Sequence, residues 1–235
     1  MFERLSKLLG GRNCHWSSGD DEPESQPVSL LQTLDSKVAH WAFLRGFFYS
    51  SKSGGEVFTL TGTTGDFDWK LECVPSQRDY MSGMELRGRA EAKVTDDVTV
   101  LVMNRVLKDT LEKKAFSLYT DTLQTEVKPE LCEEMRWLAV YPEGGWDSLP
   151  DPFWSRYAVM SDRRHYAQRW LNPKMTSILM ALPETSFYAP IPTMLMLMRG
   201  KVHVRIQYSP LDISTLELAV QLLNEGSAVA KALAQ

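Results

Sequence analysis

The stretch from residue 84 to residue 104 most constrains how this chain can fold. In its first ten residues, small or apolar side chains alternate with charged ones, the two-residue period of a strand with one face in the core and one in water. Residues 94–97 have turn chemistry, and residues 98–103 are mostly apolar, as expected for a strand buried on both faces. We therefore predict a long hairpin at the middle of an antiparallel sheet, with Leu86 and Ala90 facing the core.

The other segments alternate between helical and strand periodicity. Residues 67–74 repeat the two-residue alternation, whereas residues 105–124 place leucines at helical spacing. Strands and helices in the resulting order are typical of an α+β fold. We expect helices over residues 29–48, 105–124, 161–170, 173–182 and 214–226, a short helical turn over 129–135, and strands over 56–62, 67–74, 84–93, 98–103, 137–141, 153–160, 193–198 and 202–208.

These elements predict a mostly antiparallel sheet with helices packed on one face. The layout of residues 27–128 is similar to that of residues 129–235. Two similar lobes, each with its own sheet, and one continuous sheet both fit this pattern. The strand over residues 202–208 is a candidate for a sheet edge, where it could pair with a second copy in a homodimer.

The charge balance argues against one large class of function. The chain has 26 Lys and Arg against 30 Asp and Glu, so it lacks the basic field with which most nucleic-acid-binding proteins attract phosphates. No apolar run reaches the roughly 18 residues needed to cross a bilayer, and the first residues do not have the pattern of a secretory signal. The three cysteines are too far apart to predict a disulfide framework or a metal knuckle. We therefore expect a cytoplasmic protein.

The first 26 residues differ in composition from the rest. Phe2, Leu5 and Leu9 share one face of a short amphipathic helix that could dock on a partner, a membrane surface or the chain's own domain. A marginal helix that is frayed in solution is the competing explanation, because nine residues rarely hold a helix alone. Residues 10–26 are rich in Gly, Ser, Asp and Glu, which is typical of a flexible acidic linker. We therefore assign the globular domain to residues 27–235.

Four residues are candidates for binding a ligand. Asp66 and Asp68 place two carboxylates near the start of a strand, where they could bind a cation, although turn and strand-surface roles explain the same pair. Arg87 and Arg89 occupy polar positions of their strand and could bind an anion. Because glutamates alternate with these arginines, cross-strand ion pairs on a solvated face are the competing explanation.

Two tryptophans are candidates for contacting a protein partner. Trp146 and Trp154 belong to a loop rich in Pro, Gly and Asp, which could present an aromatic anchor or could instead fold over the sheet and cover the core. The histidines lack metal-ligand spacing, and the sequence has no nucleophile elbow or phosphate-binding glycine loop. We therefore expect no catalytic constellation, no metal and no cofactor.

Short segments in the body also carry a resemblance. They are Trp69-Lys-Leu-Glu72, Pro75-Ser-Gln-Arg-Asp-Tyr80, Gly83-Met-Glu-Leu-Arg87, Glu134-Met-Arg-Trp-Leu138 and Leu197-Met-Arg-Gly-Lys-Val202. In these segments the chain resembles uncharacterised proteobacterial proteins of about this size. The resemblance implies a bacterial cytoplasmic protein and implies no activity.

The leading hypothesis from the sequence is a non-catalytic interaction or regulatory module. It is favoured because no catalytic spacing is present and because an N-terminal amphipathic segment precedes the domain. The alternative is a small-ligand-binding protein, or an enzyme whose site has no recognisable motif, with Arg87, Arg89, Asp66 and Asp68 as its candidate residues.

Overall fold

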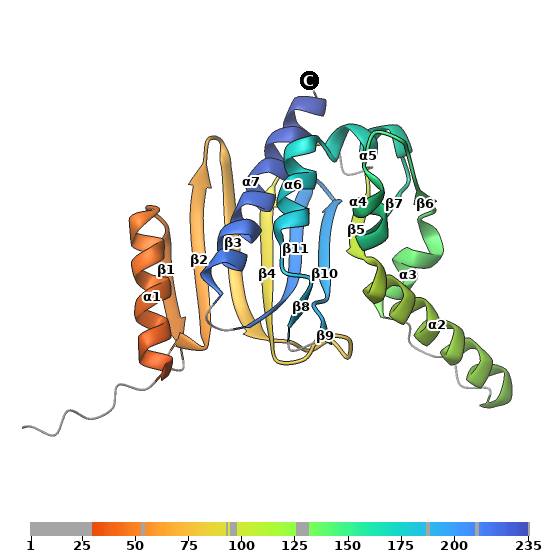
Figure 1. Cartoon of the computed structure of the whole chain (residues 1–235), viewed down its shortest axis with the longest axis horizontal. Helices are drawn as coiled ribbons and strands as arrows, with labels where there is room; N and C mark the ends of the chain where they lie inside the picture. The colour runs from red at the N-terminus through yellow and green to blue at the C-terminus, as the bar shows by residue number, and fades with distance from the viewer. Residues whose placement is uncertain are drawn as a thin grey trace, which may run out of the picture.

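The computed structural model describes residues 30–52, 55–92, 94, 98–125, 132–186, 189–209 and 212–234. These residues form an α+β fold built on one continuous antiparallel sheet of nine strands (Figure 1). The strands of the sheet are β1 (Phe48–Lys52), β2 (Val57–Thr64), β3 (Phe67–Pro75), β4 (Met84–Glu91), β5 (Val100–Asn104), β6 (Glu143–Gly144), β7 (Tyr157–Ser161), β10 (Thr193–Met198) and β11 (Lys201–Tyr208).

Seven helices and a small second sheet complete the described part of the chain. The helices are α1 (Leu30–Leu44), α2 (Arg105–Thr125), α3 (Glu133–Val140), α4 (Asp151–Arg156), α5 (Arg164–Trp170), α6 (Pro173–Ala181) and α7 (Ile213–Ala234). The small sheet pairs β8 (Thr185–Ser186) with β9 (Ala189–Pro190). None of the described helices is both long enough and apolar enough to span a bilayer.

The strand order is β1-β2-β3-β4-β11-β10-β5-β7-β6, so the predicted hairpin of residues 84–104 is wrong. The strands β4 and β5 both form, but the β10–β11 hairpin lies between them. The alternation in β4 matches that in β11, which pairs with it along all eight residues from Lys201 to Tyr208. Period and turn chemistry identified the strands but did not specify which strands pair.

The first face of the sheet carries the larger core. Leu86 and Ala90 of β4 are 0% and 2% exposed on this face, which confirms the predicted inward side of the strand. The helices α1, α7, α6 and α5 cover it, with α7 crossing in front of the central strands (Figure 1). Gly88 lets α7 approach closely, because a Cβ there would lie 2.9 Å from Leu223 Cδ1.

The second face carries a smaller core over the strands β5, β7 and β10. Methionines dominate it: Met103, Met160, Met194, Met196 and Met198 pack with residues of α2 and α3. Such a Met-rich cluster fills irregular space without polar atoms that need partners. Helices therefore lie on both faces of the sheet, whereas the sequence pattern suggested one.

Three local predictions are corrected. Residues 137–141 lie mostly in the helix α3, where Glu133 and Glu134 occupy the favourable first turn. Residues 153–160 divide between the short helix α4 and the strand β7, because Pro152 sits at the start of a helix, where its missing N–H is harmless. The strand β1 was missed, since Phe48–Lys52 has weak alternation and lies at the edge.

The final strand is not at an edge. The strand β11 pairs with β4 on one side and β10 on the other, so the edge argument for a homodimer through residues 202–208 is wrong. Strands from residues 27–128 and from residues 129–235 interleave in one sheet. The segment over residues 1–26, including Phe2, Leu5 and Leu9, lies outside the described residues.

Candidate functional site

A charged surface occupies the part of the second face that β3, β4 and β11 form. Its members are Lys70, Glu72, Glu85, Arg87, Arg89, Glu91, Lys201, His203 and Arg205, which we call the charged face. Strand register sets its rows, because residues that are paired across antiparallel strands project from the same side. One row runs Lys70, Arg89, His203, and the next runs Glu72, Arg87, Arg205.

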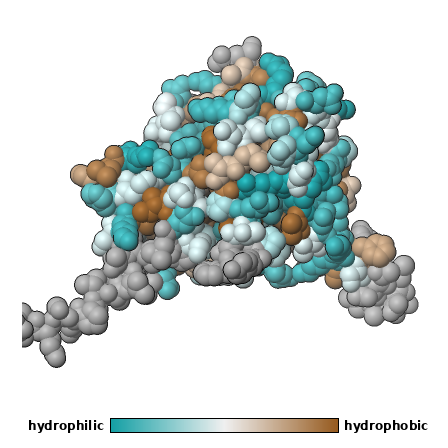
Figure 2. Space-filling view, in the orientation of Figure 1, coloured by the Kyte–Doolittle hydropathy of each residue, from teal (hydrophilic) through white to brown (hydrophobic). Residues whose placement is uncertain are grey.

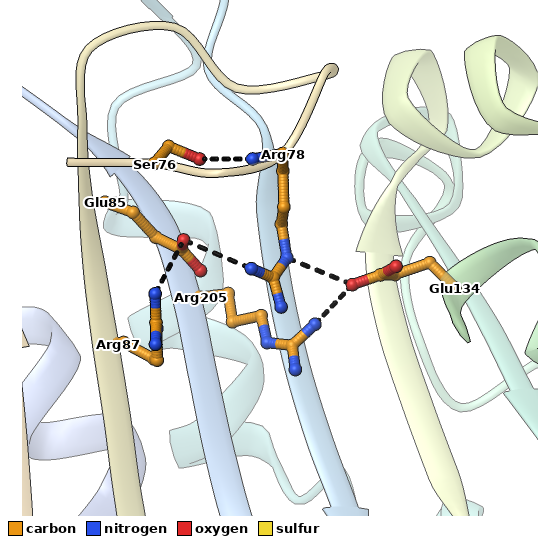
Figure 3. Close-up of polar contacts among 6 residues, drawn as sticks. All are labelled: Ser76, Arg78, Glu85, Arg87, Glu134 and Arg205. Atoms are coloured by element: carbon orange, nitrogen blue, oxygen red, sulfur yellow. Dashed lines mark hydrogen bonds and ion pairs between the residues drawn. The ribbon is translucent and has the colours of Figure 1, made fainter. Parts of the chain in front are cut away.

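A buried group of ion pairs closes one end of the charged face (Figure 3). Glu85 of β4 is fully buried, which corrects the expectation that every charged residue of this strand is solvated. Its Oε2 lies 3.4 Å from Arg78 Nη1 and 3.6 Å from Arg87 Nη2. Figure 3 shows the Arg78 side chain reaching from the β3–β4 connection to a position between Glu85 and Glu134.

Glu134 joins this group from the helix α3. Its Oε1 accepts a hydrogen bond of 3.0 Å from Arg78 Nε and one from Arg205 Nη1 (Figure 3). Burial alone would raise the pKa of Glu134, but hydrogen bonds and the guanidinium groups of Arg205 and Arg78 outweigh it and lower the pKa below its ordinary value. Arg205 also lies over the ring of Trp137, at 5.7 Å from its centroid. These contacts attach α3 to the sheet, so this end of the charged face has a structural role.

The middle of the charged face is different, because it holds an arginine without an ion pair. Lys70 Nζ lies 2.6 Å from Glu72 Oε1, and Lys201 Nζ lies 2.8 Å from Glu91 Oε1. Arg89 stands between these pairs, is exposed, and forms no ion pair with any residue that the structure describes. Because the neighbouring lysines are already in ion pairs and the Arg89 guanidinium is exposed, Arg89 can donate hydrogen bonds to an anion from solution.

His203, the β11 partner of Arg89, is surrounded by positively charged side chains. Burial lowers its pKa to about 4, and the nearby cations of Arg205, Lys201, Arg89 and Arg199 act in the same direction. The imidazole is therefore neutral at physiological pH. An anion that bound beside Arg89 would raise this pKa.

A hollow extends from Arg89 toward the edge of the sheet. It has a volume of about 730 Å³, and its lining includes Lys70, Arg89, Asp68 and Phe48. Phe48 is 69% exposed, so the hollow combines an apolar wall with two cations, Lys70 and Arg89, and two carboxylates, Asp68 and Glu91. Phe43 and Leu44, at the end of α1, are also exposed, and Figure 2 shows hydrophobic residues on the left of the molecule where α1 ends. Of these exposed apolar side chains, Phe48 lines the hollow, and apolar side chains beside a few polar groups are typical of a binding site.

The structure brings three of the four predicted ligand residues to one face. Arg87, Arg89 and Asp68 all project from the second face, although Arg87 belongs to the ion pairs and Asp68 accepts a hydrogen bond of 2.9 Å from Thr63 Oγ1. Asp66 lies in the β2–β3 turn, and its Oδ2 is 2.5 Å from Lys231 Nζ of α7. The predicted pair of carboxylates is thus divided between two different contacts.

The two tryptophans of the predicted partner site contact each other. Trp146 is 7% exposed, and its ring meets that of Trp154 edge to face at a centroid distance of 5.1 Å. Trp154 Nε1 donates a hydrogen bond of 3.2 Å to the Trp146 carbonyl oxygen. Trp146 belongs to the larger core, the half-buried Trp154 packs against that core, and both border a separate hollow of about 600 Å³. A partner-binding role for this pair stays a prediction.

Sequence reasoning missed several residues of the site. Arg78, Glu134 and the β11 residues His203 and Arg205 come from three distant parts of the chain and meet only through the pairing of β4 with β11 and the docking of α3. The sequence pattern that could have identified His203 and Arg205 is the alternation of residues 202–208, which places both side chains on the polar face of a strand. Within the described residues, no three His, Cys, Asp or Glu side chains are grouped as metal ligands.

Comparisons with known proteins give no family. No protein-family model and no curated protein matches this sequence. Among solved structures, the chain is similar to the crystal structure of the mycobacterial trehalose monomycolate transport factor A, TtfA, with 11% sequence identity and a TM-score of 0.47. The similar region covers 83% of this chain and 93% of that chain. A likeness this distant carries no inference about function.

Proposed function

We propose that this chain is a non-catalytic interaction module that binds a short acidic segment of a partner protein on its charged face. The observation that carries the proposal is Arg89, an exposed guanidinium without an ion pair among the described residues, beside a hollow with an apolar wall. Arg89 would make the central contact with a carboxylate, and Phe48 would contact apolar atoms of the partner.

The distribution of charge supports a short acidic peptide over a continuous phosphate backbone. Binding to nucleic acid depends on several cations that each neutralise a phosphate. Here Glu72, Glu91 and Asp68 surround Arg89, so a long polyanion would meet repulsion on either side. A single carboxylate can contact Arg89 and avoid these three groups. Charge-assisted hydrogen bonds of this kind are roughly twice as strong as neutral ones.

A cytoplasmic location and a regulatory role belong to the same proposal. Cys73 and Cys132 are free thiols, which is consistent with a reducing compartment. The hollow also favours a second candidate function, the binding of a small anionic ligand by Arg89 and Lys70. If the chain binds a peptide, apolar atoms of the peptide add to the affinity; if it binds a small anion, one or two carboxylates account for all of it.

The test measures binding of a short fluorescent peptide, with one glutamate flanked by leucines, to the full chain by anisotropy at low salt. We expect Arg89→Ala to weaken binding about tenfold or more, because a hydrogen bond to a charged group contributes about 1.5–3 kcal/mol. The matched control is Arg169→Ala, which removes an exposed arginine of α5 on the first-face side. Equal affinity for the two variants would overturn the proposal. Glutarate competing as well as the peptide, mole for mole, would overturn it in favour of the small-ligand function.

A further inference from the structure

The hollow beside Trp146 and Trp154 is separate from the charged face and differs from it in charge. It has a volume of about 600 Å³ and is lined by residues of β6, the strand at the opposite edge of the sheet from β1. We infer that this hollow binds a lysine or arginine side chain of a partner protein. The inference does not rest on the proposed function, because the lining contains no residue of the charged face.

The charge of the lining is the first support. Three carboxylates, Glu143, Asp147 and Asp151, and one guanidinium, Arg105, line the hollow, so its lining has a net charge of −2. Arg105 already has partners, since its Nη2 lies 3.0 Å from Glu143 Oε1 and its Nε donates a hydrogen bond to the Trp154 carbonyl oxygen. The charges that are left for a ligand are therefore the two aspartates.

Asp147 and Asp151 are both exposed, and neither carboxylate contacts a cation or a hydrogen-bond donor among the residues that the structure describes. The other cations nearby have contacts of their own. Lys108 Nζ lies 3.2 Å from Glu143 Oε2, while Arg164 lines a neighbouring hollow and donates a hydrogen bond to a backbone carbonyl oxygen. A cation from a partner can thus form charge-assisted hydrogen bonds with the two aspartates without displacing an existing ion pair.

Trp154 adds an aromatic wall to the same hollow. Its half-buried ring packs edge to face against Trp146 and Phe153, at centroid distances of 5.1 Å and 5.3 Å. A tryptophan ring attracts a cation, and the alkyl stem of a lysine or arginine packs well on such a surface. Because these contacts already hold the ring in place, binding would restrict it little further.

Trp146 supplies a hydrogen-bond donor without a partner. The residue is 7% exposed and lines the hollow, and its Nε1 has no acceptor among the described residues. A buried indole N–H usually has an acceptor. A backbone carbonyl oxygen of a segment seated in the hollow would supply one, which favours a basic residue of a polypeptide over a simple amine.

The experiment follows the indole Nε1–H resonance of Trp154 by NMR while the full chain is titrated with a capped peptide that has one lysine flanked by alanines. Peptides with arginine or norleucine in place of the lysine show whether the positive charge is needed. Butylamine tests the ammonium group without a polypeptide. The variant carries Asp147→Asn and Asp151→Asn. Its matched control carries Glu56→Gln, at the start of β2, and Glu133→Gln, in the first turn of α3, which remove two exposed carboxylates elsewhere.

We expect the lysine or the arginine peptide to shift this resonance saturably and the norleucine peptide to bind at least about tenfold more weakly. The aspartate variant should lose about tenfold in affinity for the basic peptide, and the control variant should match the natural chain.

Three results would overturn the inference. They are no saturable shift with either basic peptide, equal affinities for the norleucine and basic peptides, and equal affinities of the aspartate and control variants. Butylamine binding as tightly as the lysine peptide would overturn the assignment to a partner protein. Arg89→Ala should leave this titration unchanged, so the inference and the proposed function can fail separately.

Discussion

Glu134 should contribute more to stability than any exposed carboxylate of this chain, and Glu134→Gln tests this. Its carboxylate is 4% exposed and contacts both Arg78 and Arg205. The substitution keeps the size of the side chain but removes its charge, leaving the two guanidinium groups close together and mostly buried. Breaking a buried ion pair by removing one partner typically costs about 3–5 kcal/mol. We expect a loss of free energy of unfolding within this range.

The matched control is Glu133→Gln. Glu133 is the neighbouring residue in the first turn of α3, but it is exposed. Both substitutions lose the favourable interaction of a carboxylate with the helix dipole, about 0.3–1 kcal/mol, so the difference between them isolates the ion pairs. Urea unfolding gives both free energies. In thermal unfolding, the Glu134 variant should melt at least about 6 °C lower, since 1 kcal/mol corresponds to about 2–4 °C at this chain length.

The pH dependence of that difference provides an independent check. The pKa of Glu134 is lowered in the folded protein, so its stabilising contribution is complete above the unfolded pKa and is lost as pH falls through the folded pKa. The stabilities of the natural chain and Glu134→Gln should therefore begin to converge as pH falls below about 4.3, the ordinary pKa of a glutamate, and should become equal only below the folded pKa. Equal losses for the Glu134 and Glu133 variants at neutral pH would refute the role assigned to the buried ion pairs.

Two further predictions concern neighbouring positions. The pKa of His203 is lowered from 6.5 to about 4 in the folded protein, so the unfolded chain takes up a proton first as pH falls. The free energy of unfolding of the natural chain should therefore decrease between pH 6.5 and about pH 4, and that of His203→Gln should decrease much less. Urea titrations at several pH values measure both. Leu86→Asp should lower the free energy of unfolding by roughly 3 kcal/mol or more, because Leu86 is fully buried. Arg87→Ala should lower it by about 1 kcal/mol, because the ion pair with Glu85 is lost. Equal melting temperatures for these two variants would contradict the assigned faces of β4.

The sequence was sufficient to predict the fold class and the faces of individual strands. In β4 and β11 the alternation of side chains decides which side meets the larger core, while the other side carries polar side chains that, apart from Glu85, are exposed or half-buried. Pairing could not be predicted in the same way. The strand β11 is more than a hundred residues away from β4 in the chain, and hydrophobic period does not distinguish one compatible partner from another.

The candidate site was predictable to the same extent. Arg89 was identified because it falls on the polar positions of a strand, and that needs only local sequence. The fact that Arg89 lacks an ion pair while Arg87 has one depends on what stands opposite each of them. Arg87 lies beside Glu85, which the β3–β4 connection covers through Arg78, whereas Arg89 lies beside His203, a neutral base.

The contrast between the two halves of the second face explains why no described helix covers the middle of the charged face. On β10 the residues of this face are Met194, Met196 and Met198, and they are covered by a core that includes residues of α2 and α3. On β11, the next strand, the corresponding partners are Arg205, His203 and Lys201, which stay partly exposed. Burying the charges of Lys201 and Arg205 without partners would cost several kcal/mol each, and α3 contacts Arg205 by supplying Glu134 as its partner. Under the proposed function, an anionic partner would cover this surface because it supplies the charge that Arg89 lacks.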